Sequence, residues 1–97
     1  MKLNKELFKK LNILYVENDE KIKESFSDTL NKLFNKVFLC SDGLDALDKF
    51  TQLNDTSEKI DVILSEYSIP SLNGLKLLFK IRDINKNVPF IFITQET

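Results

Sequence analysis

Short apolar runs and longer amphipathic stretches alternate along this chain. The apolar runs are Ile13–Val16, Val37–Cys40, Val62–Leu64 and Phe90–Ile93. Almost continuous apolar runs of this length are typical of strands that are covered on both faces, as in a parallel sheet. The pattern therefore predicts four buried strands.

Between the runs, apolar residues recur every three or four positions, with charged residues on the opposite side, which predicts helices. Three long helices are marked by Ile22, Phe26, Leu30, Leu33 and Phe34, by Leu44, Leu47, Phe50 and Leu53, and by Leu75, Leu78, Phe79 and Ile81. Asn18 or Asp19, Asp42-Gly43 and Asn73-Gly74 supply the capping and turn residues at their starts. A short leading helix is expected over residues 1–11. The order predicts one layered α/β domain over residues 1–97 with right-handed crossovers.

Composition narrows the chemistry. The net charge of −1, from 14 basic and 15 acidic residues, gives no reason to expect nucleic-acid or anionic-membrane binding. The chain lacks an apolar run of the ~18 residues of a membrane span and the apolar core of a signal peptide. It has no histidine, and its one cysteine, Cys40, is expected to be a small buried residue. This excludes an internal disulfide, the usual zinc clusters and Cys–His or Ser–His–Asp catalysis, and it favours a reducing, cytoplasmic location.

Polar residues stand where three of the predicted strands end. Glu17-Asn18-Asp19 follow the first strand, Glu66 follows the third, and Thr94 follows the fourth. In open parallel sheets, ligands bind outside the carboxyl ends of the strands. Clustered carboxylates repel one another and need a cation or a shared proton, so Mg²⁺ is the natural candidate ligand.

The segments "ILYVEND", "DVILSEYSIPSLNG" and "VPFIFIT" resemble the receiver domain of two-component response regulators. The resemblance covers essentially the whole chain. The resemblance implies a flavodoxin-like (CheY-like) three-layer αβα sandwich with a parallel sheet of order 2-1-3-4. It also implies a bacterial, cytoplasmic signalling module rather than an enzyme, with a histidine kinase or another signalling protein as its partner and without direct binding to nucleic acid or membrane.

The family's functional positions fall on particular residues of this chain. The resemblance places Glu17 and Asn18 on the pair of acids after the first strand and Glu66 on the phosphate-accepting aspartate. It places Ser68 on the residue whose carbonyl helps to hold the metal, and Thr94 on the switch hydroxyl.

The chain departs from the family at two of these positions. The Glu66 carboxylate reaches ~1.5 Å further than an aspartate would, and a misplacement of ~1 Å costs ~10²-fold in rate. Asn18 is neutral where the family has a charged ligand, so Mg²⁺ is expected to bind weakly. Asp19 is a partial substitute, or instead caps the following helix. Pro70 and Gly74 are expected to shape the loop after the third strand.

The family pattern continues beyond the fourth strand with further helices and a fifth strand that ends in a lysine. In this chain those elements are expected to be missing or supplied by a partner chain. The fourth strand would then be an exposed apolar edge that favours a homodimer or strand exchange.

The leading hypothesis is a receiver-like domain that is not conventionally phosphorylated. It would signal through protein–protein interaction, either independently of phosphate or with Glu66 as a mimic of the phosphorylated acceptor. The alternatives are a Mg²⁺-dependent phosphotransfer or hydrolase domain that uses Glu17, Asp19 and Glu66, and a purely structural oligomerisation module.

Overall fold

Four parallel strands form one sheet in the order β2-β1-β3-β4. The computed structural model describes residues 5–93 of the chain. Its elements are α1 (Lys5–Phe8), β1 (Asn12–Val16), α2 (Glu20–Leu33), β2 (Lys36–Cys40), α3 (Gly43–Leu53), β3 (Val62–Glu66), α4 (Gly74–Ile84) and β4 (Phe90–Ile93).

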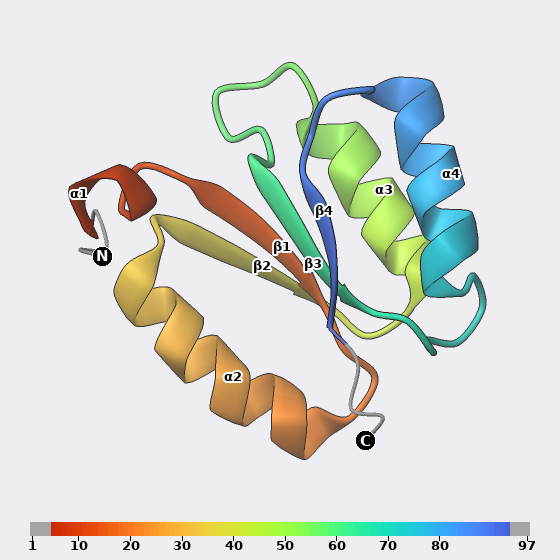
Figure 1. The fold of residues 1–97 in the computed structure, drawn as a ribbon, viewed down its shortest axis with the longest axis horizontal. Helices are drawn as coiled ribbons and strands as arrows, with labels where there is room; N and C mark the ends of the chain where they lie inside the picture. Colours follow the sequence, from red (N-terminus) through yellow and green to blue (C-terminus); the bar gives the residue numbers. More distant parts are fainter. Residues whose placement is uncertain (1–4, 94–97) are drawn as a thin grey trace.

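Helices cover both faces of this sheet, which makes three layers. Helix α2 lies across one face, and α3 and α4 lie side by side on the other (Figure 1). The predicted α/β class, the three-layer sandwich and the strand order 2-1-3-4 are therefore confirmed.

The hydrophobic core is largest beneath α3 and α4. Alternate residues of β1 and β3 point into it, and it includes Leu14, Val16, Phe50, Ile63 and Leu77. A smaller cluster under α2 is built on Ile13, Tyr15 and Leu30. All five residues of β1 are buried, because this strand has a neighbour on either side and helices over both faces. Cys40 is buried as expected.

Each long helix begins at a side chain that accepts a backbone N–H. Asp19 accepts from Ile22 at the start of α2, Asp42 from Asp45 in α3, and Asn73 from Lys76 in α4. These caps use donors that the first turn of a helix leaves unpaired. They place the three starts at the capping residues that the sequence offered.

Strands β1 and β2 begin one residue earlier than predicted, and α1 and β3 differ more from the expectation. The leading helix is one turn long within the described residues, because the chain turns at Lys9 and Lys10 before it enters β1. It is held by ring packing of Phe8 on Phe34, with centroids 5.5 Å apart. The third strand runs on to Glu66, whose backbone pairs with Ile93 of β4.

Strand β4 is the outermost strand of the sheet on its side. Its Ile91 side chain is 50% exposed, whereas the residues of β1 are fully covered. None of the helices within residues 5–93 is long and apolar enough to cross a membrane.

Candidate functional site

Glu17 and Glu66 lie side by side at the carboxyl edge of the sheet. Val16 of β1 and Ser65 of β3 are register partners, so the next residue of each chain segment is an acid. Neighbouring strands are ~4.8 Å apart, and side chains alternate between the two faces. Both carboxylates therefore extend from the face that α2 covers, where Tyr15 and Leu64 precede them.

The carboxylate of Glu66 is only partly solvated. Its Oε2 atom is buried and has no hydrogen-bond partner within the described residues. A buried carboxylate oxygen without a donor or cation costs free energy, because it has given up its water without a replacement. The geometry thus leaves an unused acceptor at the end of β3.

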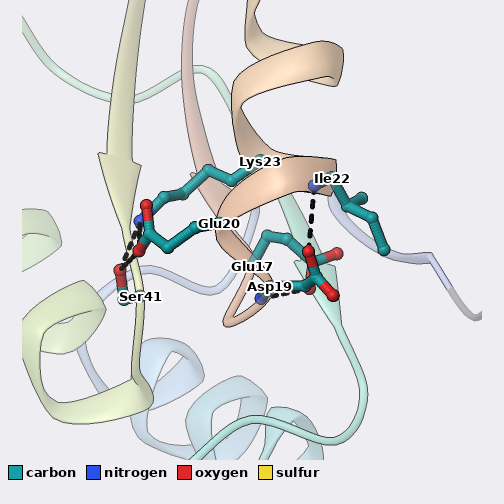
Figure 2. A network of polar contacts seen from close by, with 6 residues as sticks. All are labelled: Glu17, Asp19, Glu20, Ile22, Lys23 and Ser41. Carbon is teal, nitrogen blue, oxygen red and sulfur yellow. Dashed lines mark hydrogen bonds and ion pairs between the residues drawn. The ribbon is translucent and has the colours of Figure 1, made fainter.

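Glu17 is 4% exposed and is tied to its own loop. Its Oε2 accepts the backbone N–H of Asp19 at 3.1 Å, and Oδ1 of Asp19 accepts the N–H of Ile22 at 3.1 Å (Figure 2). The first acid is therefore fixed by the turn that starts α2. Asp19 acts as the helix cap, which was one of the two roles expected for it.

Tyr15 lies one strand repeat before Glu17, on the same face of the sheet. Burial, reinforced by the negative charges of Glu17 and Glu66, raises the pKa of Tyr15 to about 12. The phenol thus stays protonated near the two acids. Its ring packs against Phe26 of α2, with centroids 5.6 Å apart.

The remaining predicted positions lie around these acids. Asn18 and Ser68 are exposed, each in the loop that directly follows its strand. The predicted switch residue Thr94 lies outside the described residues. The structure therefore brings Glu17 and Glu66 together, with Asn18 and Ser68 on adjoining loops.

Lys23 of α2 contacts the turn between β2 and α3. The Lys23 side chain is 12% exposed, and its amine donates to Oε1 of Glu20 at 2.9 Å and to the hydroxyl of Ser41 (Figure 2). Ser41 is the first residue after β2. Lys23 consequently links helix α2 to the β2–α3 turn.

The loop after β3 is folded closely against both helices of the other face. The N–H of Gly74 donates to the carbonyl of Tyr67 at 2.8 Å, which closes the loop. A Cβ atom at Gly74 would lie 2.8 Å from the Phe92 ring and 3.0 Å from the carbonyl oxygens of Glu66 and Tyr67. Only glycine fits here without displacing its neighbours.

The acidic side chains at this edge meet the requirements of Mg²⁺ only in part. Within residues 5–93, no three His, Cys, Asp or Glu side chains come together as a metal site. Magnesium sites in proteins, however, commonly use one or two carboxylates completed by carbonyl oxygens and water. Neighbouring acids and the unpartnered Oε2 of Glu66 fit a weakly held cation of this kind.

Three contributors to this edge were not singled out from the sequence. The apolar run around Tyr15 predicts a core residue. The only sign that it faces the acids is its spacing of two residues from Glu17, which places both on the same face of the sheet. Lys23 resembled one more residue of a charged helix face. Ser71 follows Pro70 directly, and no motif in the sequence marks it.

Comparison with known proteins gives a consistent result. The family model described as "Response regulator receiver domain" matches residues 13–97. "Two-component response regulator-like APRR9" of Arabidopsis thaliana is 34% identical over 89% of this chain, which spans 18% of that protein. Chemotaxis protein CheY1 of Helicobacter pylori is 29% identical, with 89% of this chain and 68% of the relative aligned.

Solved structures agree in fold. The chemotaxis response regulator CheY4 of Vibrio cholerae superposes with a TM-score of 0.76 at 28% identity, over 91% of this chain and 71% of that one. The receiver domain of the histidine kinase CKI1 of Arabidopsis thaliana, solved with Mg²⁺ and BeF₃⁻, has a TM-score of 0.83 at 19% identity, over 97% and 72% of the two chains. At 19% identity, the similarity to the CKI1 receiver domain supports the fold alone.

Proposed function

This chain belongs to the response regulator receiver domain family, and on that premise we propose that it signals without the ordinary cycle of aspartyl phosphorylation. Glu66 occupies the position of the phosphate acceptor. Its carboxylate takes part in signalling as a fixed negative charge rather than as a nucleophile. The domain then acts by protein–protein interaction and not as an enzyme.

One observation carries this proposal. The Glu66 carboxylate stands at the end of β3 beside buried Glu17, with one oxygen buried and unpartnered. Its extra methylene moves the reacting oxygen outward by ~1.5 Å, into the space that a phosphoryl group would need. In-line attack depends on placement to within ~1 Å. A carboxylate held here is therefore better suited to imitate a charged acceptor than to accept phosphate.

Magnesium belongs to the same proposal as a weak ligand. The residues that would hold it are Glu17, Glu66, the amide oxygen of Asn18 and the backbone carbonyl of Ser68, the last by resemblance to the family. When bound, the cation would neutralise part of the charge at this edge. With Asp19 engaged at the start of α2 and Asn18 neutral, two carboxylates supply the negative charge.

The partner class follows from the family. A histidine kinase or another signalling protein is the expected partner, and the cytoplasm is the expected location. The accessible features are the carboxyl-edge loops, the outer helix surfaces and the outermost strand β4, whose Ile91 is 50% exposed.

The experiment is incubation of the purified chain with Mg²⁺ and a small-molecule phosphodonor, followed by intact-mass measurement. We expect no stable adduct of one phosphoryl group. The Glu66→Gln variant is the matched control for modification elsewhere. An acyl phosphate on the wild type that is absent from Glu66→Gln would overturn the proposal.

A further inference from the structure

The loop that follows Glu66 is bonded in its middle to another helix. Residues 67–73 connect β3 to α4, yet the centre of this loop contacts the start of α3. The N–H of Gly43 donates to the carbonyl of Pro70 at 3.1 Å. A Cβ atom at Gly43 would lie 1.9 Å from the carbonyl oxygen of Leu72, so the two backbones touch directly.

Ser71 supplies the side-chain part of this contact. Its hydroxyl accepts the N–H of Leu44 at 3.2 Å and donates to Oδ1 of Asp42 at 3.1 Å. The same Asp42 oxygen accepts the N–H of Asp45 at 2.9 Å. A residue of the β3–α4 loop therefore completes the cap of α3, because it takes an N–H that the first turn of the helix cannot pair internally.

The backbone of Ser71 is held in an uncommon conformation. Its φ angle is 66°, in the left-handed region that residues other than Gly, Asn and Asp rarely adopt. A serine stays there when the surrounding contacts compensate for the strain. Both hydrogen bonds of the Ser71 hydroxyl lie at the surface, so each stabilises the contact only modestly.

Contacts continue from Asp42 towards α2. Ser41, the preceding residue, accepts from Lys23 and lies 3.4 Å from Oε1 of Glu20, to which its hydroxyl donates (Figure 2). A continuous series of bonded groups thus runs from α2 through the β2–α3 turn to the loop behind Glu66. The start of α3 lies between the two ends of this series.

We propose that Ser71 is a latch that couples the state of the Glu66 carboxylate to the N-terminus of α3. Binding of a cation or a partner protein at the Glu66 carboxylate displaces it and alters the path of the loop that begins at the next residue. The hydroxyl of Ser71 passes this change to Leu44 and Asp42, and its release removes the side-chain part of the contact between the loop and α3. The inference rests on the proposed function, because it names how the Glu66 site reaches a helix surface.

Backbone amide chemical shifts provide the test. Glu66→Gln removes the charge with little change in shape, and we expect it to shift the amide resonances of Tyr67, Leu44 and Asp45. In a Ser71→Gly background, where glycine accepts the positive φ without the hydroxyl, the response at Leu44 should fall to about half or less, while that at Tyr67 persists. The bond from Gly43 to Pro70 remains and accounts for the residual response.

Ser57→Gly is the matched control. Ser57 is exposed in a loop, and among the described contacts its side chain makes no hydrogen bond to a helix, so this variant should leave the response unchanged. Ser71→Ala serves as a second variant that lacks the hydroxyl. The latch is contradicted if Leu44 does not respond to Glu66→Gln in the wild type, or if it responds in both Ser71 variants as strongly as it does with Ser71 present. No phosphodonor is used, so this result is separate from the phosphorylation test.

Discussion

At the scale of single residues, the site is defined by two acids and a phenol rather than by one acceptor. Glu17 is fixed by the N–H of Asp19, Glu66 keeps one oxygen unpartnered, and Tyr15 stays protonated near both. The Glu66 carboxylate, with one oxygen buried, lies where its charge acts on the phenol.

The elevated pKa of Tyr15 predicts a specific loss of stability at alkaline pH. Because the folded-state pKa is about 12 and the ordinary value is 10.0, the folded protein holds this proton more tightly than the unfolded chain does. Stability is retained below pH 10.0 and is lost as the pH rises towards 12. Denaturant unfolding across this range should show a weaker pH dependence in Tyr15→Phe than in the wild type. An equal pH dependence of Tyr15→Phe and the wild type would refute the assignment.

Asn18→Asp should strengthen Mg²⁺ binding. It adds a third carboxylate charge beside Glu17 and Glu66, and oxygen ligand charge sets the affinity for hard cations. We expect a gain of roughly tenfold, or ~1.4 kcal/mol, by titration calorimetry. Asp19→Asn, at the capping position, should alter the affinity much less. The reverse ranking of the two variants would place the ligand on Asp19.

At the scale of elements, the starts of the helices explain how the site is held. Each long helix begins at an Asp or Asn cap, and α3 and α4 begin at the only two glycines of the chain. Both glycines permit a loop backbone to approach closely. The β3–α4 loop thereby contacts α3 at Gly43 and returns to α4 at Gly74.

Alanine at these glycines should destabilise the protein to different extents. At Gly43 the new Cβ meets a backbone carbonyl at 1.9 Å, and at Gly74 its nearest neighbour is a ring carbon at 2.8 Å. We expect a loss of about 1–3 kcal/mol for Gly74→Ala and a larger loss for Gly43→Ala, by denaturant unfolding. At an open helical site, the same change stabilises by roughly 0.5–1 kcal/mol. A gain in stability for Gly43→Ala would therefore disprove the close approach.

The elements themselves were largely predictable from the sequence. Apolar runs gave the four strands and the caps gave the helix starts, because both signals are local. The leading helix was overestimated, since Leu11 continues its apolar pattern while the chain must turn to enter β1. The roles of Tyr15 and Ser71 were not predicted. That of Tyr15 depends on the register of β1 and β3, and that of Ser71 on a contact between loops distant in sequence, and residue patterns encode neither.

At the scale of the whole molecule, stability comes mainly from the core beneath α3 and α4. Leu77 of α4 is fully buried in it, while Leu75 of the same helix is 38% exposed. Leu77→Ala should cost roughly 2–5 kcal/mol of unfolding free energy, and Leu75→Ala about 1 kcal/mol or less. Similar losses for the two variants would mean that α4 packs on the sheet through a different face.

This arrangement separates the scaffold from the signalling site. The core fixes the sheet, while the acids and the loops around them lie at its carboxyl edge. Changes at Glu66 or Asn18 should therefore alter ligand chemistry more than folding. That separation allows the receiver fold to be kept while residues at its carboxyl edge change.

The central claim is that Glu66 does not become phosphorylated, and its most direct measurement is a time course of acyl phosphate on the peptide that carries this residue. The wild-type chain is incubated with Mg²⁺ and a small-molecule phosphodonor beside a receiver domain with an aspartate acceptor. Mass spectrometry should detect the modification on the aspartate of the reference domain and none on Glu66 at any time. A stable acyl phosphate on Glu66 would contradict the account.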